Sequence, residues 1–219
     1  MNDVSVIIPV FNGRRYLRDA IRSVLAQTIV PREIVVVDDG STDDSASLAR
    51  DLGVTCVSQH HAGQGAALNH GIARSQGSAV AFLDADDVWM PNKLELQLEV
   101  LAGSVPIDAV FGHAVQFGEA IADSPPMPAR LPSALLVRRV TLQRVGPFDT
   151  ELRLGCPVEW AIRLEESGVG VAMLPQVLYR RRLHGDNSGR IHAERRGDYL
   201  DIVRRKLRRA ATLREPKAC

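Results

Sequence analysis

Three carboxylates stand close together in the stretch FLDADDVW, at residues 82–89. Asp84 and Asp86 are alternate residues directly after an apolar run, and alternate residues of an extended segment can point the same way. Two carboxylates on one side repel each other, and a shared divalent cation removes that repulsion. The triplet Asp84-Ala85-Asp86 therefore indicates a Mg²⁺ or Mn²⁺ site; a solvated turn is the alternative, because D-x-D is common by chance. We expect Asp87 to be a helix-start residue.

A second pair of acids, Asp38 and Asp39, ends the apolar run that begins at residue 33. An acid at a strand end can accept hydrogen bonds from a ribose hydroxyl or a base N–H, whereas helix capping by Ser41 and Asp39 explains part of the same motif. Neither G-x-G-x-x-G nor G-x-x-x-x-G-K-[ST] follows the first strand, which disfavours a dinucleotide cofactor and a P-loop NTPase. The stretch GQGAALNHG, at residues 63–71, could bring backbone N–H groups to an anion or be an ordinary loop before a helix.

His184 is the histidine that its surroundings favour for a site. It stands in RRRLHGDN, after a strand-like run and before a glycine. There it could be a third metal ligand or a phosphate contact. The other histidines are interpreted mostly as surface or helix residues.

The elements that must position these residues alternate between strand and helix signals. Apolar runs lie at residues 4–10, 33–38, 54–57 and 79–83, and residues at helical spacing separate them. Near-continuous apolar strands are typical of a parallel sheet buried on both faces, so the order predicts an α/β fold with βαβ units. In such sheets ligands bind outside the carboxyl ends of the strands, where the polar residues 11–12, 38–39 and 84–86 stand.

The composition indicates one folded domain with room for a small appendage. Its 219 residues are 45% hydrophobic and 24% charged, which argues against global disorder. The net charge of +1 decides nothing about nucleic acid, and we expect no nucleic-acid partner. Three scattered cysteines without C-x-x-C argue against a disulfide framework and a structural zinc site. We see neither a signal peptide nor an apolar stretch of about 20 residues, so a cytoplasmic location is expected.

Charge is distributed unevenly along the chain. From Arg180 onward, 13 Lys and Arg stand against 5 Asp and Glu, which leaves 14 against 21 in the preceding part. Residues 191–219 are expected to form a basic C-terminal helix and tail, with Leu200, Val203 and Leu207 in one stripe. This helix could make a peripheral contact with an anionic membrane or a polyanionic acceptor; the alternative is that it docks on the acidic body.

Four stretches together resemble, in order and spacing, the nucleotide-binding half of family 2 glycosyltransferases of the GT-A fold. They are VSVIIPVFNGRRYLRDAIRSVLAQT, EIVVVDDGSTDDS, GQGAALNHGIARSQG and VAFLDADDVWMPNKLELQL. RVGPFDTELRLG and EWAIRLEESG resemble the start of the acceptor half, so the resemblance covers roughly residues 3–190. It implies a mainly parallel, twisted sheet flanked by helices. It also implies inverting transfer of a sugar from a nucleotide-diphospho-sugar, with Mn²⁺ or Mg²⁺.

The resemblance assigns roles at the ends of the first two strands. Pro9, Phe11 and Asn12 would line the nucleotide pocket. Asp39, or its neighbour Asp38, would contact the base.

Further roles follow for residues later in the chain. Asn69 would lie near the ribose and the diphosphate. In the triplet around Ala85, Asp84 would approach the ribose and Asp86 would bind the metal that bridges the phosphates. His184 fits the extra metal or phosphate ligand that some relatives carry after a late strand.

The chain is also expected to divide by function. Residues 1–112 would be the nucleotide-sugar-binding half, residues 113–190 the acceptor-side half of the same domain, and residues 191–219 the C-terminal helix and tail. The acceptor stays open between a glycan, a lipid, a peptide and a small molecule.

The stretch GCPVEW departs from the family pattern. After FDxxLRLG the family usually has Glu-Asp, and this Asp is the general base that deprotonates the acceptor hydroxyl. Cys156 and Pro157 stand there instead, and proline cannot take a proton. Glu159 is the remaining candidate base, although a helix N-terminal glutamate explains it as well. The alternative function is a degenerate nucleotide-sugar-binding protein with little or no transfer. A nucleotidyltransferase is a third interpretation, for which FNGRR is a poor loop.

Overall fold

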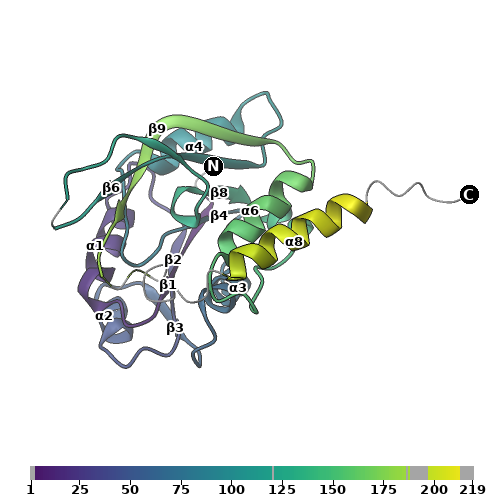
Figure 1. Cartoon of the computed structure of the whole chain (residues 1–219). Helices are drawn as coiled ribbons and strands as arrows, with labels where there is room; N and C mark the ends of the chain where they lie inside the picture. The colour runs from purple at the N-terminus through teal and green to yellow at the C-terminus, as the bar shows by residue number, and fades with distance from the viewer. Residues whose placement is uncertain (1–2, 120, 186, 188–196, 213–219) are drawn as a thin grey trace, which may run out of the picture.

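The structure is a computed structural model that describes residues 3–119, 121–185, 187 and 197–212 (Figure 1). Within them, nine strands form one sheet in the order β3-β2-β1-β4-β8-β6-β9-β5, with β7 paired to β6. The strands are β1 (Val4–Val10), β2 (Glu33–Asp38), β3 (Thr55–Ser58), β4 (Ala79–Phe82), β5 (Val88–Trp89), β6 (Ala109–Phe117), β7 (Met127–Ala129), β8 (Leu136–Arg138) and β9 (Val171–Arg182). The helices are α1 (Arg14–Leu25), α2 (Ser45–Asp51), α3 (Gln64–Arg74), α4 (Lys93–Ala102), the 3₁₀ helix η1 (Pro132–Ala134), α5 (Arg139–Val145), α6 (Cys156–Glu166) and α8 (Gly197–Thr212).

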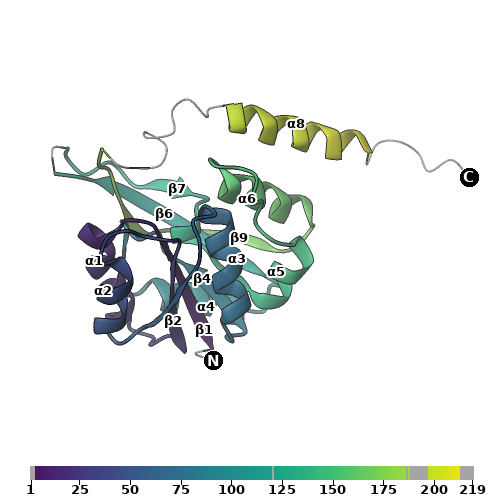
Figure 2. The same ribbon diagram turned by 90° about the horizontal axis from the view of Figure 1, so that it is seen from below.

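The first half of the sheet is parallel, as its apolar runs predict. β1 lies between β2 and β4, pairs with both in parallel, and is buried along its whole length. Figure 2 shows α1 and α2 on one side of β1 and α3 on the other. Gly71 allows α3 to approach closely, because a Cβ there would stand 2.4 Å from Ile7 Cγ2. The carboxyl ends of β1, β2 and β4 therefore meet at one edge, which we call the carboxyl edge.

The second half of the sheet is mixed. β8 runs antiparallel to both β4 and β6, while the long strand β9 pairs in parallel with β6 and antiparallel with β5. The strands from β6 to β8 follow one another without a crossover helix, and antiparallel pairing needs none. The predicted α/β sheet flanked by helices is confirmed, although only its first half is entirely parallel. The expected division at residues 112 and 113 falls inside β6, so both halves share the sheet and the division remains a functional proposal.

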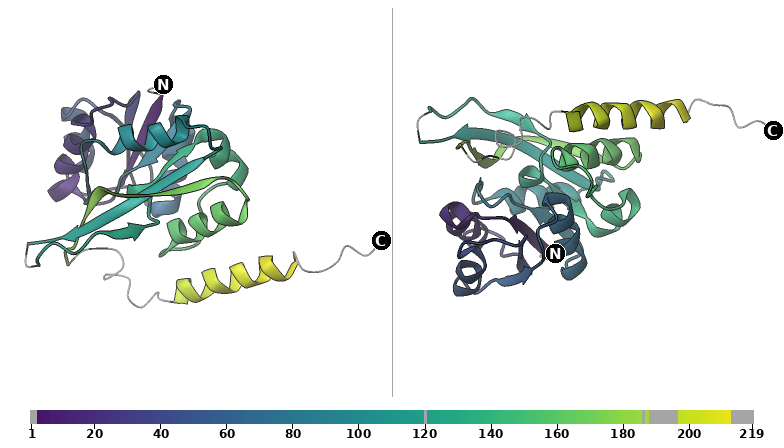
Figure 3. Two further views of the ribbon diagram at one scale, coloured as in Figure 1. Left: turned by 90° about the horizontal axis from the view of Figure 1, so that it is seen from above. Right: turned by 60° about the horizontal axis from the view of Figure 1, so that its bottom comes forward.

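A C-terminal helix, α8, lies outside the sheet and runs beside α6 (Figure 3). It covers part of the predicted C-terminal segment; residues 191–196 and 213–219 lie outside the described residues. None of the described helices is both long enough and apolar enough to cross a membrane.

Candidate functional site

The acidic loop after β4 lies at the carboxyl edge, next to the end of β9. His184 Nε2 lies 2.9 Å from Asp86 Oδ2, although the two residues are 98 positions apart. Asn187 Nδ2 donates to the same carboxylate oxygen at 3.0 Å. The Tyr16 ring of α1 packs on the His184 ring, with centroids 4.7 Å apart. The structure therefore brings together two of the residues predicted to hold a metal.

Asp84 is the second predicted ligand in this loop. Gln64 Nε2 donates to Asp84 Oδ1 at 2.9 Å, and the Asp84 backbone N–H donates to Ser133 Oγ at 3.1 Å. Burial and, after it, the charge of Asp86 raise the pKa of Asp84 from 3.8 to about 7. Ala85, between the two acids, is partly exposed. A cation bound beside these carboxylates would remove the repulsion that raises this pKa.

Asp87 is not a helix-start residue, so that expectation is wrong. Its side chain is 3% exposed, and its carboxylate accepts from Ser133 Oγ at 2.8 Å and from the Arg182 backbone N–H at 3.0 Å. Arg182 Nε also donates to the Asp86 carbonyl oxygen at 3.0 Å. These partners come from η1 and β9, far away in sequence, and they hold the acidic loop against the end of β9.

The Asp86 and His184 pair fits a divalent cation that also binds a diphosphate. No cluster of three or more His, Cys, Asp or Glu that could hold a metal occurs in the part of the chain that the structure describes. Mg²⁺ and similar ions commonly use one or two protein ligands together with substrate phosphates, so a two-residue site matches that chemistry. The Tyr179 hydroxyl is buried and has no hydrogen-bond partner among the described residues. Burial, followed by the charges of Asp87 and Asp84, raises the pKa of Tyr179.

Arg181 is a site residue that the sequence interpretation missed. Arg180 and Arg182 lie over the Phe117 ring, 4.3 and 4.6 Å from its centroid. Because neighbours on a strand point to opposite faces, Arg181 points away from that ring. Against the upward effect of burial, the charge of the Arg181 guanidinium lowers the pKa of Asp84. The run of three arginines at a strand end was the available signal, and Arg182 reaches the acidic loop as well, through Nε and the Asp86 carbonyl oxygen.

Asn12 ties two turns of the carboxyl edge together. Its φ of +50° is in the left-handed region, which asparagine enters more readily than most residues. The Asn12 amide oxygen accepts from the Thr42 backbone N–H at 2.8 Å, and the Asn12 backbone N–H donates to Ser41 Oγ at 2.9 Å. Pro9 is buried within β1 beside Val37. Both predicted residues lie near the end of β1, and their contacts are with the chain itself.

Asp38 and Asp39 organise the loops around them. They are 5% and 3% exposed. Asp38 Oδ1 accepts from the Ser41 backbone N–H at 3.0 Å, and the two Asp39 oxygens accept from the backbone N–H groups of Ala62 and Gly63 at 2.9 and 2.8 Å. Asp39 thus holds the loop before α3 in place, and Asp38 holds the turn after β2. Their expected contact with a base stays a prediction.

An aromatic stack stands at the same edge and was not expected. The Phe11 and His61 rings stack with centroids 4.0 Å apart and an interplanar angle of 28°. His61 Nδ1 lies 3.0 Å from Asp39 Oδ2, which fixes the ring. Phe11 is 47% exposed, so a flat ring surface is open to solvent where the nucleotide pocket is predicted. Such a surface is suited to stacking on a nucleobase.

Asn69 connects α3 to the loop before α6, and its expected place near the ribose and the diphosphate stays a prediction. Its Nδ2 donates to the Phe148 carbonyl oxygen at 2.8 Å, and its Oδ1 accepts from the Phe148 backbone N–H at 2.8 Å. Nearby, a Cβ on Gly65 would stand 2.5 Å from the Asp149 carbonyl oxygen. The start of α3 and the loop before α6 are thus in close contact. Both polar groups of the Asn69 amide stabilise this contact between α3 and the loop before α6.

The first turn of α6 begins at the positions where the family pattern has carboxylates. Cys156 is 1% exposed, and burial, followed by the charge of Asp84, raises the pKa of its thiol to about 12. Such a thiol stays protonated at neutral pH and cannot act as a base. Pro157 lines a small apolar pocket with Phe148 and Trp160. Neither residue supplies a proton acceptor.

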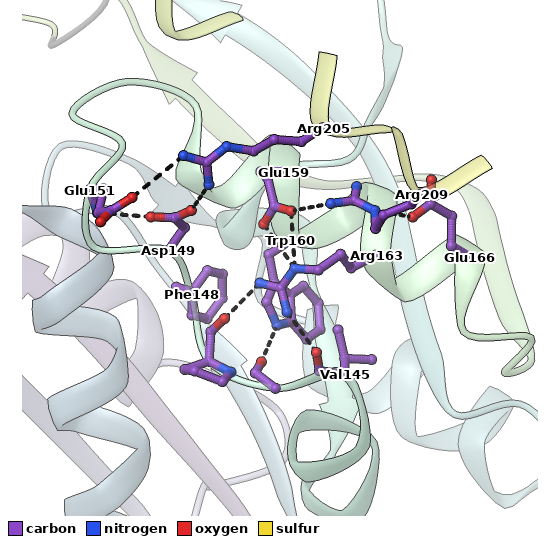
Figure 4. Close-up of polar contacts among 12 residues, drawn as sticks. Val145, Phe148, Asp149, Glu151, Glu159, Trp160, Arg163, Glu166, Arg205 and Arg209 are labelled. Atoms are coloured by element: carbon purple, nitrogen blue, oxygen red, sulfur yellow. Dashed lines mark hydrogen bonds and ion pairs between the residues drawn. The ribbon is translucent and has the colours of Figure 1, made fainter. Parts of the chain in front are cut away.

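Glu159 is held by two arginines, which argues against its expected role as general base (Figure 4). Its side chain is 4% exposed; Arg163 Nε lies 2.9 Å from Oε2, and Arg209 Nη1 lies 3.1 Å from Oε1. Arg209 belongs to α8, which covers this side of α6. An acceptor hydroxyl has no open approach to a carboxylate enclosed in this way. Glu159 therefore has the contacts of a structural ion pair.

A comparison with known families settles the class of the chain. The family model described as "Glycosyl transferase family 2" matches residues 5–149. The matched stretch runs from β1 to the loop before α6 and includes the acidic loop. The chain belongs to glycosyltransferase family 2.

Individual relatives agree with this assignment. The chain is 38% identical over 186 residues to an uncharacterized glycosyltransferase of Nostoc sp., covering 73% of this chain and 56% of the relative. It is 40% identical over 104 residues to the putative teichuronic acid biosynthesis glycosyltransferase TuaG of Bacillus subtilis, covering 45% of this chain and 41% of that protein. The chain thus spans about half of these relatives or less.

Solved structures of low sequence identity share the fold. The S. aureus protein TarS superposes with a TM-score of 0.73 at 18% identity, covering 93% of this chain and 38% of TarS. The mannosyltransferase PcManGT of Pyrobaculum calidifontis, solved in complex with GDP-Man and Mn²⁺, gives a TM-score of 0.72 at 20% identity and covers 99% of this chain and 66% of that one. The GT-A fold that the sequence implied is thereby confirmed.

Proposed function

We propose that this chain binds a nucleotide-diphospho-sugar with Mn²⁺ or Mg²⁺ and transfers the sugar, with inversion, to an acceptor. The observation that carries the proposal is the contact of Asp86 with His184 at the carboxyl edge, where Asp86 Oδ2 and His184 Nε2 lie 2.9 Å apart. Membership of glycosyltransferase family 2 supports the reaction class. The complex of PcManGT with GDP-Man and Mn²⁺ supports a donor of this kind.

Each residue of the site would act on one part of the donor. Asp86 and His184 would hold the cation against the diphosphate, and the cation, when bound, would stabilise the leaving phosphate as a Lewis acid. Asp84 would accept a hydrogen bond from a ribose hydroxyl. Phe11 and His61 would stack on the base.

A second candidate function is donor binding with little or no transfer. It is favoured by the first turn of α6, where Cys156 is a buried thiol, Pro157 has no titratable group, and Glu159 is enclosed by two arginines. An inverting displacement normally needs a base on the acceptor side. The two candidates share the donor site and differ only in this turn.

The donor site is tested by calorimetric titration with UDP, GDP and their sugar derivatives, with Mn²⁺ and with chelator. We expect binding to require the cation, and Asp86→Ala to weaken it more than about tenfold, which corresponds to ~1.4 kcal/mol. Asp51→Ala, an exposed acid on α2, is the matched control and should bind as the parent protein does. Equal affinity with chelator and with Mn²⁺ would remove the metal role of Asp86.

The base is tested separately, by hydrolysis of whichever nucleotide-sugar binds. Restoring the family carboxylate with Pro157→Asp should raise turnover sharply while donor affinity stays the same. The melting temperature of the variant must be measured alongside, because Pro157 lines an apolar pocket. A folded Pro157→Asp protein that binds donor with unchanged turnover would show that this position is not the base position.

A further inference from the structure

One face of α8 docks on α6 and on the loop before it. Ile202 is 2% exposed and packs against Leu152 and Cys156. The Asp198 carboxylate accepts from the backbone N–H groups of Arg153 and Leu154, at 3.0 and 2.9 Å. The helix is thus attached by apolar and polar contacts to the loop before α6.

The same face is attached by ion pairs to acids of the body. Arg205 pairs with Asp149, and Arg209 pairs with Glu159 at 3.1 Å and with Glu166 at 2.7 Å (Figure 4). Arg205 and Arg209 of the basic helix therefore face inward. The opposite face of α8 makes none of these contacts.

The outward face of α8 is apolar. Leu200, Val203 and Leu207 form what we call the exposed stripe, and they are 61%, 54% and 64% exposed. At about 100° per residue, their mean direction lies roughly 165° from that of the docked residues 198, 202, 205 and 209. Solvating three neighbouring aliphatic side chains is unfavourable, so a helix with this arrangement is suited to a partner on its outer side.

Basic and aromatic side chains border the exposed stripe. Arg204, which pairs with Asp201 at 2.9 Å, lies along one side of it and Lys206 along the other, and both are exposed. Tyr199, beside Lys206, is 44% exposed. An apolar stripe with flanking cations and an aromatic residue is the pattern of a helix that lies in the interface of an anionic bilayer.

We propose that the exposed stripe of α8 docks on an anionic lipid bilayer, with Arg204 and Lys206 facing the lipid headgroups. A second copy of the chain is a weaker fit, because a standard protein interface takes about 20–30 residues a side and the stripe offers a single row. The inference goes beyond the proposed sugar transfer and does not require it.

Docking in this orientation has a geometric consequence. Figure 2 places α8 on the side of the molecule toward which β1 runs, away from the N-terminus. The loop before α6 lies directly beneath the helix. A bilayer against the exposed stripe would therefore face the acceptor side of the site.

The test is flotation of the whole chain with vesicles of phosphatidylcholine, alone or with about 30% phosphatidylglycerol. We expect binding to the anionic vesicles only, and a loss of about tenfold or more when Leu200→Gln, Val203→Gln and Leu207→Gln are combined. The matched control replaces exposed valines elsewhere, Val30→Gln, Val105→Gln and Val140→Gln, and should float as the parent does.

Other results would overturn the proposal. No binding of the parent chain to anionic vesicles at low salt would do so, as would unchanged flotation of the stripe variant. A parent dimer in light scattering that the stripe variant converts to a monomer would identify a second copy as the occupant. Circular dichroism of each variant checks that α8 is retained, so a loss of binding can be assigned to the stripe.

Discussion

Side chains at the carboxyl edge fall into two groups according to what they already contact. Asp39, Asp87 and Asn69 use their polar atoms on backbone groups of distant segments, and so fix the loops. Asp86 and His184 contact each other at 2.9 Å, which is the spacing at which one cation could be shared between them. Substitutions in the first group should change stability, whereas those in the second should change ligand binding.

Substitution of Arg181 and of its neighbour on β9, Arg180, tests which of two adjacent arginines affects ligand binding. We expect Arg181→Gln to weaken binding of a nucleoside diphosphate about tenfold, because its charge acts on Asp84, beside which the phosphates would bind. Arg180→Gln, whose side chain lies over Phe117 and pairs with Asp123, should leave affinity unchanged. Calorimetric titration in Mn²⁺ measures both. Equal effects of the two substitutions would mean that strand alternation does not separate the two arginines.

For Glu159 we expect substitution to change stability, where substitution of Arg181 should change ligand binding. Glu159→Gln leaves Arg163 and Arg209 without their shared carboxylate, so we expect unfolding to become easier by roughly 1–3 kcal/mol, allowing for the partial exposure of both arginines. Glu165→Gln on the same helix, whose pair with Arg130 is exposed, should change stability by less than about 0.5 kcal/mol. Urea unfolding gives both values. Loss of turnover in folded Glu159→Gln protein, with stability unchanged, would restore Glu159 as a base.

At the scale of elements, the packing of α4 also has a measurable consequence. Lys93 is fully buried; its Nζ donates to Gln97 Oε1 at 2.7 Å and lies 4.0 Å from the centroid of the Trp89 ring. No carboxylate pairs with it among the described residues. Burial therefore lowers the pKa of Lys93 well below 10.5.

The pH dependence of stability follows from this lowered pKa. Between the folded pKa and the unfolded value of about 10.4, the unfolded chain binds more protons than the folded chain, so the free energy of unfolding should rise with pH. Lys93→Met should flatten this rise, and Lys206→Met, at an exposed position, should not. Urea unfolding between about pH 6 and pH 9 compares the slopes. A parent slope that persists in Lys93→Met would assign the rise to other groups.

The elements were predictable where local pattern determines them. Apolar runs located β1, β2 and β4, and their order implied the parallel half and its ligand-binding edge. The burial of Asp87 was not predictable, because it depends on Ser133 and on β9, which only the fold brings near. Docking of the basic helix on the acidic body was one of two alternatives from the sequence, but the inward turn of Arg205 and Arg209 in particular was not predictable. It depends on acids in α6 and in the loop before it, and it leaves outward a stripe of aliphatic residues that a periodicity argument would bury.

At the scale of the whole molecule, α8 joins the end of the chain to the start of α6. Cys156 lies under this contact, 1% exposed and packed against Ile202. Its reactivity therefore reports whether α8 is docked, since a thiol reagent reaches it only when the helix moves away. The raised pKa of the buried thiol, about 12, slows its reaction further while α8 is in place.

We expect Arg205→Gln combined with Arg209→Gln to increase the labelling rate of Cys156 by about tenfold, in a background in which Cys56→Ser and Cys219→Ser remove the other thiols. The two arginines hold α8 to Asp149, Glu159 and Glu166, and these partly exposed ion pairs are screened by salt, so labelling of the parent should also accelerate with ionic strength. Arg204→Gln, on the outward face, should leave the rate unchanged. If the double variant protects Cys156 as well as the parent does, the apolar contact of Ile202 alone holds the helix, and its docking would be independent of charge.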